Sequence, residues 1–426
     1  MSIPEDFLHY LWKFRLFSQQ GLATAAGDSI EIISVGLHNK NAGPDFESAK
    51  IRIGKTLWVG NVEIHLRSSD WERHQHQLDQ TYDSVILHVV ANHDKDIFRT
   101  DGTKIPAVSL GALIPQKISD NYLRLQESME WIPCGKQISS LNPFHIRTWL
   151  HRVEIERLEE KSGSINEVLN EFKGSWDDAF YIFLARNFGF KTNAMPFEML
   201  ARSLPQTLLA RYKNRPLQIE SLIFGQAGFL LSKHMDEYPE ILRKEYLFLQ
   251  KKHLLQPMDN YLWKYMRMRP VNFPTIRLAQ FAALIIRSNH LFSRILIETD
   301  MRKIIGMFDN LPVNDYWRKH FRFDTETACS YPGFGKQSID NILINTVSIF
   351  LMAYGRSTDS AEHISRSISL LENLPGETNA LVNRFKETGL NVENAFFSQS
   401  LLQLKKAYCD QKKCLSCGIG MKLLNG

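Results

Sequence analysis

Apolar residues near the start of the chain recur every three or four positions, as they do on one face of a helix. This face comprises Phe7, Leu8, Leu11, Trp12 and Leu16. Pro4 precedes the run and Gly21 follows it, which is typical of the start and end of a helix. The pattern predicts an amphipathic helix as the first element.

The next hundred residues alternate between apolar and polar positions or form short apolar runs, which is typical of strands. We expect strands at residues 29–35, 48–53, 55–66, 84–90, 97–99 and 104–110. The dipeptides Gly54-Lys55 and Asp101-Gly102 are turn signals that predict two hairpins. The helix and these strands together predict an α/β domain with a mixed sheet over residues 1–115.

Strand signals almost vanish after residue 115, and helical patterns separated by Gly, Pro and Asn follow. We expect helices at residues 143–160, 165–172, 177–188, 197–202, 205–212, 219–229, 240–252, 275–289, 339–354 and 378–389. The fold class is therefore α+β. A helical domain over residues 116–400 would follow the first domain, and a Cys-rich tail would cover residues 401–426.

Composition excludes several classes of protein. With 426 residues, 44% hydrophobic and 23% charged, the chain is neither disordered nor a coiled coil, and it has room for two or three domains. No run of 18 apolar residues predicts a membrane span, and the first residues are acidic where a signal peptide would be basic. We therefore expect a cytoplasmic protein with no membrane partner. The sequence indicates no oligomeric state.

Charge is unevenly distributed along the chain. Residues 1–115 hold 11 Lys and Arg against 14 Asp and Glu, a net charge of −3. Because the whole chain has a net charge of +5, the remaining residues carry +8. This pattern fits a metal-binding module joined to a module that binds nucleic acid, and it also fits ordinary scatter.

Two carboxylates and an imidazole are predicted to converge in the first domain. Because side chains alternate along a strand, Glu63 and His65 project from one face of the strand at residues 55–66. If the hairpin pairs Ile53 with Thr56, residue 46 lies near residue 63, and Asp45 then lies close to Glu63. Such a trio suits Mg²⁺ or Mn²⁺, which activates water and stabilises charge on a phosphate.

Five of the 14 histidines lie between residues 65 and 93. His74 and His76 would add metal ligands or a phosphate contact, or else they are polar surface residues of a loop and short helix. His88 lies in an apolar strand, where a hydrogen-bonded core histidine is the favoured interpretation.

Pro44-Asp45, followed by Glu63-Ile64-His65, resembles the motif of the PD-(D/E)XK nucleases, the restriction-endonuclease-like family. The resemblance implies that Asp45 and Glu63 bind the metal and that His65 acts as base or third ligand where the family has Lys. It also implies a first helix bearing an acid, here Glu5, before a mixed sheet. Imidazole in place of Lys would shift the metal preference toward Mn²⁺, or it would mean that activity is lost.

The whole chain also resembles an uncharacterised bacterial family of unknown function. The shared stretches are GPDF, GNVEIH, SDW and the Cys-rich end. This resemblance implies no activity.

Three of the five cysteines, Cys409, Cys414 and Cys417, lie within nine residues. Thiolates at this spacing suit Zn²⁺ or an iron–sulfur cluster, each of which normally has four ligands. Cys134 and Cys329 are the candidates for the fourth, and we predict Cys134. Some PD-(D/E)XK-like nucleases have a similar layout of three late cysteines and one early cysteine. The alternative is incidental thiols in the tail.

Basic residues alternate with aromatic residues later in the chain, as they do on surfaces that bind single strands. These basic residues are Lys264, Arg267, Arg269 and Arg277. They are candidate nucleic-acid contacts, or else they belong to the solvated and buried faces of helices.

The sequence thus predicts a metal-dependent nuclease that hydrolyses phosphodiester bonds in DNA or RNA. One alternative is a non-catalytic nucleic-acid-binding or scaffold protein with a degenerate nuclease core. A second is a metal-dependent hydrolase of a small phosphorylated substrate.

Overall fold

The computed structural model describes residues 3–328 and 333–425 of the chain. The chain divides into two compact units. Unit 1 comprises residues 1–149 and 405–426, and unit 2 comprises residues 150–404. The expected boundaries near residues 115 and 400 differ from this division, because the segment after residue 115 and the tail both pack within unit 1.

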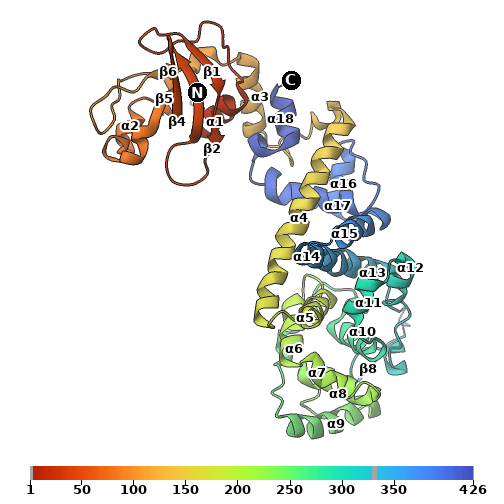
Figure 1. Cartoon of the computed structure of the whole chain (residues 1–426). Helices are drawn as coiled ribbons and strands as arrows, with labels where there is room; N and C mark the ends of the chain where they lie inside the picture. Colours follow the sequence, from red (N-terminus) through yellow and green to blue (C-terminus); the bar gives the residue numbers. More distant parts are fainter. Residues whose placement is uncertain (1–2, 329–332, 426) are drawn as a thin grey trace. The chain divides into compact units, whose positions relative to one another are not determined.

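A six-stranded mixed sheet forms the centre of unit 1 (Figure 1). Its strands are β1 (Ile30–Ser34), β2 (Leu37–His38), β3 (Phe46–Ile53), β4 (Thr56–Arg67), β5 (Val85–Asn92) and β6 (Ala107–Ser109). The spatial order is β1-β3-β4-β5-β6, and β2 pairs with β3. β1, β3 and β4 pair antiparallel, whereas β5 and β6 continue the sheet in parallel.

The hairpin between β3 and β4 sets the position of the candidate site. Ile53 pairs with Thr56 across the turn at Gly54, as the sequence predicts. Further along, an irregularity shifts the register so that Phe46 pairs with Val62 rather than with Glu63. Ser48 takes a left-handed φ of 59° there, which is typical of a bulge residue. The shift keeps Asp45 beside Glu63.

Helix α1 (Glu5–Phe14) buries its apolar face in unit 1. Phe7, Leu8, Leu11 and Trp12 are all completely buried, as the helical spacing predicts. Phe7 stacks on Tyr122 of α3 (Gln116–Glu127), with ring centroids 4.2 Å apart. α3 was not predicted, because its mostly polar sequence hides its apolar stripe.

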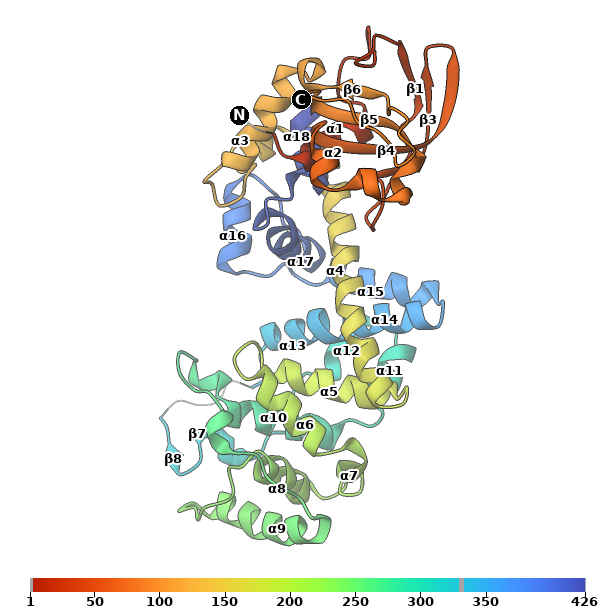
Figure 2. The same ribbon diagram turned by 90° about the vertical axis from the view of Figure 1, so that its left-hand side faces the viewer.

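The remaining elements of unit 1 are short. They are α2 (Asp70–Arg73), η1 (His76–Leu78), η2 (Gln80–Ser84), η3 (Gly111–Leu113), η4 (Ile138–Ser140), the π-helical turn η9 (Lys405–Cys409), η10 (Cys414–Ser416) and α18 (Gly418–Asn425). α18 lies beside α3 in both views (Figures 1 and 2). The side-chain amide of Asn121 donates hydrogen bonds to the carbonyls of Leu423 and Leu424, which joins the tail to the N-terminal domain.

Unit 2 is helical. α4 (Pro143–Glu171) begins in unit 1 and ends in unit 2. Unit 2 continues with α5 (Trp176–Phe188), α6 (Ala194–Ser203), α7 (Gln206–Ala210), α8 (Pro216–Gln226), α9 (Glu237–His253), η5 (Asn260–Leu262), η6 (Pro270–Asn272), α10 (Pro274–Arg287), α11 (Leu291–Ile297), α12 (Met301–Gly306), η7 (Asp315–Arg318), β7 (His320–Arg322), β8 (Thr325–Glu326), α13 (Lys336–Ile342), the π-helical turn η8 (Leu343–Val347), α14 (Ser348–Ser357), α15 (Ala361–Asn373), α16 (Ala380–Glu387) and α17 (Ala395–Leu404). The structure is thus α+β, as predicted.

One local prediction was wrong, and a second was confirmed only in part. Helices were expected at residues 143–160 and 165–172, but α4 runs through the Ser-Gly-Ser stretch between them. There Ser162 Oγ donates to the Leu158 carbonyl one turn earlier, a bond that a serine can make within a helix. A hairpin was expected at residues 97–110. Its turn and its antiparallel pairing are present, because Phe98 bridges Lys104 and the Ile105 N–H donates to the Ile97 carbonyl, but the paired stretch is too short to count as two strands. β6 instead pairs in parallel with β5.

One continuous helical segment, Lys336–Ser357, is long and apolar enough to cross a membrane by length and composition. In its most apolar window, 72% is buried within the protein. Core helices of globular units show the same property.

Candidate metal centre

The predicted trio Asp45, Glu63 and His65 comes together where the start of β3 lies beside the last third of β4, at the end of the hairpin away from its turn. The Asp45 backbone N–H donates to Glu63 Oε2 at 3.1 Å, and the Ile64 N–H donates to Asp45 Oδ2 at 2.9 Å. These reciprocal hydrogen bonds hold both carboxylates in place. They leave Glu63 Oε1 directed toward the neighbouring histidines.

Three histidines cluster beside this carboxylate oxygen. Glu63 Oε1 lies 3.6 Å from His65 Nε2 and 3.3 Å from His76 Nε2. One ring nitrogen from each of His65, His74 and His76 lies within 4.8 Å of the others, so the three could hold one metal ion. The predicted ligands His74 and His76 therefore do join the site, from α2's C-terminal end and from η1.

His88 on β5 contacts this cluster through the ring of His65. β4 and β5 pair Glu63 with His88 in parallel register, and His65 Nδ1 lies 2.8 Å from His88 Nε2. If His65 donates its Nδ1 proton to His88, the Nε2 lone pair of His65 is free for a cation. That nitrogen lies 3.0 Å from His74 Nδ1. His88 is thus a buried hydrogen-bonded histidine, as the strand pattern predicts, with a positioning role that the pattern did not reveal.

Burial determines the protonation of these groups. Burial, with the neighbouring imidazoles, lowers the pKa of His65 to about 2, and burial likewise lowers the pKa of His88 to about 3. Burial raises the pKa of Glu63, and a hydrogen bond from His76 partly offsets this. Neutral imidazoles are the form that binds metal ions. The cluster is therefore ready for a cation without first losing protons from His65.

Helix α1 contributes two residues on one face, Glu5 and His9. His9 Nε2 lies 3.2 Å from Asp45 Oδ2. Burial opposes protonation of His9, but the hydrogen bond and charge of Asp45 outweigh it, so the net pKa is raised. Burial raises the pKa of Glu5, and the charge of Asp45 adds to this. Sequence reasoning singled out Glu5 and missed His9. The spacing of four residues between them was the available signal.

A surface hollow of about 640 Å³ begins where β4 leaves the cluster. Two arginines line it, Arg67 and Arg73, and each is close in sequence to a histidine of the cluster. Ser69 and Asn92 add polar groups, while Asp70 pairs with Arg73 at 3.1 Å. The hollow therefore offers cations and hydrogen-bond donors to an anionic group.

The predicted basic surface in unit 2 requires one correction. Arg277 is only 4% exposed, and its guanidinium donates to Gln280, Asn272 and Ser338 while lying 4.3 Å from the Phe190 ring centroid. Arg277 is thus a core residue and is not available to a phosphate. The other three predicted contacts are exposed residues of the segment before α10. They are Lys264, Arg267 and Arg269.

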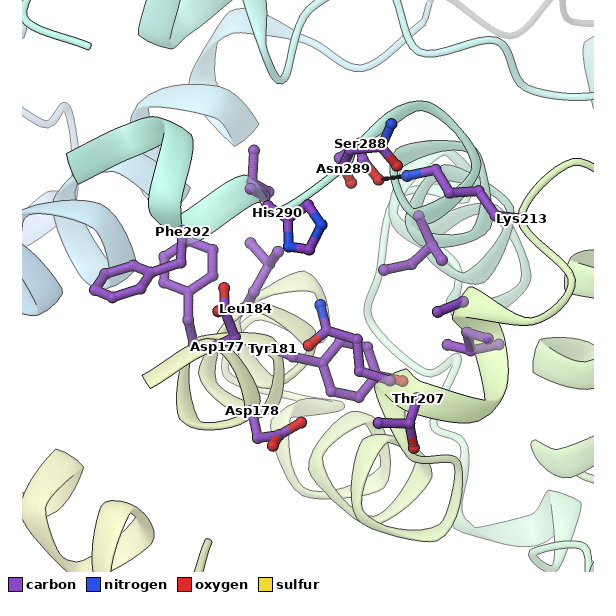
Figure 3. A pocket seen from close by; sticks show the side chains of 16 residues that line it. Asp177, Asp178, Tyr181, Leu184, Thr207, Lys213, Ser288, Asn289, His290 and Phe292 are labelled. Atoms are coloured by element: carbon purple, nitrogen blue, oxygen red, sulfur yellow. Dashed lines mark hydrogen bonds between the residues drawn. The ribbon is translucent and has the colours of Figure 1, made fainter. Parts of the chain in front are cut away.

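A second cavity, of about 310 Å³, lies in unit 2 (Figure 3). Rings and aliphatic chains form much of its wall, with Tyr181 and Phe292 among them. Lys213 donates to the Ser288 carbonyl at its edge. The cavity also has polar groups in its wall, among them Asp177, Asp178 and His290, so its lining is mixed.

The comparisons with known proteins place the chain in a family. The model of the family of proteins of unknown function DUF2851 matches residues 5–380, so the chain belongs to that family. No curated protein matches the chain, and no solved structure does.

Proposed function

We propose that unit 1 is a metal-dependent hydrolase of phosphodiester bonds in nucleic acid. The observation that carries this proposal is the convergence of Glu63, His65, His74 and His76, whose ligand atoms face one another beside Asp45. The order of helix, strand and hairpin before a parallel strand also agrees with the resemblance of the motif to PD-(D/E)XK nucleases. A divalent cation at the cluster would polarise the phosphate and lower the pKa of a bound water.

The chain's own groups have separate tasks in this proposal. Glu63, His65, His74 and His76 bind the cation, and His88 fixes the orientation of His65. Asp45 is held by the Ile64 N–H and by His9, so its carboxylate is fixed at the edge of the cluster. Arg67 and Arg73 attract the substrate phosphate. In the reaction, water adds to phosphorus, the bond to the leaving oxygen breaks, and the leaving alcohol gains a proton.

The ligand set also indicates the kind of metal. Three imidazoles and one carboxylate favour Mn²⁺, Zn²⁺ or another first-row ion, whereas Mg²⁺ prefers oxygen ligands and retained waters. We therefore expect activity with Mn²⁺ to exceed activity with Mg²⁺.

The test is incubation of the full chain with plasmid, single-stranded DNA and RNA in Mg²⁺, Mn²⁺ or Zn²⁺. We expect Mn²⁺-dependent cleavage that chelation abolishes. Glu63→Gln should lower the rate about 100-fold or more, because the neutral amide is a poor metal ligand of the same shape. Glu47→Gln is the matched control, since Glu47 is an exposed acid on β3 of the same hairpin.

Cleavage that persists in Glu63→Gln would contradict the assignment of the site. Nucleic-acid binding without cleavage under any metal would favour the scaffold alternative. Cleavage of a small phosphodiester alone would favour the alternative of a metal-dependent hydrolase that acts on a small phosphorylated substrate.

A further inference from the structure

Four cysteines from two distant parts of the sequence line one small cavity in unit 1. Cys409 ends η9, Cys414 begins η10, and Cys417 follows η10. Cys134 comes from the segment between α3 and α4. All four line the same cavity, and all four are free thiols rather than disulfides. The fifth cysteine, Cys329, lies outside the described residues.

The four thiols share the wall of this small cavity. Burial raises the pKa of Cys409, and the charges of Cys134, Cys417 and Cys414 raise it further. Cys134, Cys414 and Cys417 are buried, and Cys409 is partly buried. Four buried thiols without disulfides gain little by themselves, but as thiolates they form the ligand set of a structural metal centre.

The local backbone is shaped to bring the sulfurs together. A Cβ at Gly420 would lie 2.3 Å from the Cys414 carbonyl oxygen, and a Cβ at Gly418 would lie 2.6 Å from the Trp149 ring. Only glycine fits this close return of the chain. On the α3 side, the Gln126 side-chain amide donates to the Lys412 carbonyl at 3.1 Å. The tail is therefore held against the segment that carries Cys134.

The charge around the cavity is also suitable. Four thiolates around a divalent centre leave an excess of negative charge. The stretch from 405 to 413 contains four lysines against one aspartate, and Lys413 lines the cavity itself. Lys405 and Lys412 act electrostatically on Cys409 and Cys414. These cations compensate the charge that the centre would carry.

We propose that Cys134, Cys409, Cys414 and Cys417 hold one thiolate-ligated metal centre, an iron–sulfur cluster. Cys409-x₄-Cys414-x₂-Cys417 with a distant fourth cysteine has the spacing found in plant-type ferredoxins. Thiolates at these spacings also occur in zinc sites, so the experiment must distinguish zinc from a cluster. The centre would link residue 134 to residue 409. It would thus join the two parts of unit 1 that are separated in sequence by unit 2. This proposal does not depend on the nuclease proposal.

The experiment is anaerobic purification of the full chain, with assay of iron, acid-labile sulfide and zinc and a visible absorbance spectrum. We expect brown protein that contains iron and sulfide. Cys134→Ser should lose both, whereas Cys329→Ser, the matched control, should retain both. Protein with stoichiometric zinc and no iron would overturn the cluster. Protein with no metal after reconstitution with iron and sulfide would overturn the centre altogether.

Should Cys134→Ser prove insoluble, X-ray absorption at the iron edge of the wild-type protein provides an independent measurement. We expect sulfur as the only ligand element. Nitrogen or oxygen in the first coordination sphere, or iron lost from Cys329→Ser, would overturn the four-cysteine ligand set.

Discussion

The two units use their buried polar groups in different ways. In unit 1, imidazoles and a carboxylate face one another in the His65 cluster, and thiols face one another at Cys134. In unit 2, buried charged groups face groups of complementary kind instead, as Arg157 faces Glu154 at 3.5 Å. Arg277 is bonded to Gln280, Asn272 and Ser338, and Glu220 is buried in α8.

This difference distinguishes polar groups that are arranged to bind a ligand from polar groups that stabilise the packing of the fold. Groups of one kind facing one another repel or leave lone pairs unused, and such an arrangement is stabilised by a bound cation. Groups that face complementary partners are already satisfied, so they stabilise the fold and need no ligand. We therefore expect changes in unit 1 to alter metal content and changes in unit 2 to alter stability.

The largest effect on stability should come from Arg277→Met in unit 2. The change leaves the polar partners of the guanidinium without a donor in a buried place, which we expect to cost about 2–4 kcal/mol. Urea denaturation measures the loss. The exposed Arg269→Met is the control and should change stability by less than about 0.5 kcal/mol. Equal stability of the two variants would break the comparison, as would a loss of metal from Arg277→Met.

A pH-dependent effect should follow from Glu220. Burial raises the pKa of Glu220 to about 7, well above the usual value for a glutamate. The folded state therefore binds a proton that the unfolded state releases, and this contribution to stability is lost as the pH rises from about 4.5 through about 7. Glu220→Gln should remove this slope and stabilise the protein by on the order of 2–3 kcal/mol at about pH 8.

Denaturation of wild-type protein and Glu220→Gln across this pH range measures the difference. Glu237→Gln, which changes an exposed acid of α9, serves as the control. Parallel pH curves for the wild type and Glu220→Gln would show that Glu220 does not titrate with folding.

The smallest effect should come from His88, which touches the candidate metal centre only through His65. His88→Phe removes the acceptor for His65 Nδ1, and we expect Mn²⁺ affinity to fall about 10–100-fold. His88→Gln keeps an acceptor oxygen and should restore part of that affinity. Calorimetric titration with Mn²⁺ measures both, and His145→Phe, at an exposed position of α4, is the control. Equal affinity in both His88 variants would remove its positioning role.

Local periodicity was sufficient to predict much of the sheet. The apolar face of α1, the strands and the pairing of Ile53 with Thr56 follow from spacing and turn chemistry. The bulge at Ser48 could not be predicted in this way, because a left-handed φ at a residue other than glycine has no sequence signature. The continuity of α4 was also missed, since tertiary packing overrides the low helix propensity of a Ser-Gly-Ser stretch.

The candidate site was predictable only in part. Asp45, Glu63 and His65 could be brought together from strand alternation and the hairpin turn. His9 could not, because its approach to Asp45 depends on how α1 packs against β4. Nor could the hydrogen bond from His65 to His88, which needs the parallel register of β4 and β5. Short-range sequence patterns do not reveal contacts between segments that are far apart in the sequence.

The division of unit 1 into two separate stretches of sequence has a consequence for biosynthesis. Residues 1–149 leave the ribosome first, and 255 residues of unit 2 follow before residues 405–426 appear. Until then α3 lacks α18, and Cys134 lacks all three of the cysteines that share its cavity. Unit 1 therefore remains incomplete while unit 2 is synthesised and folds. A chaperone that shields the exposed flank of α3 would be needed most during this interval.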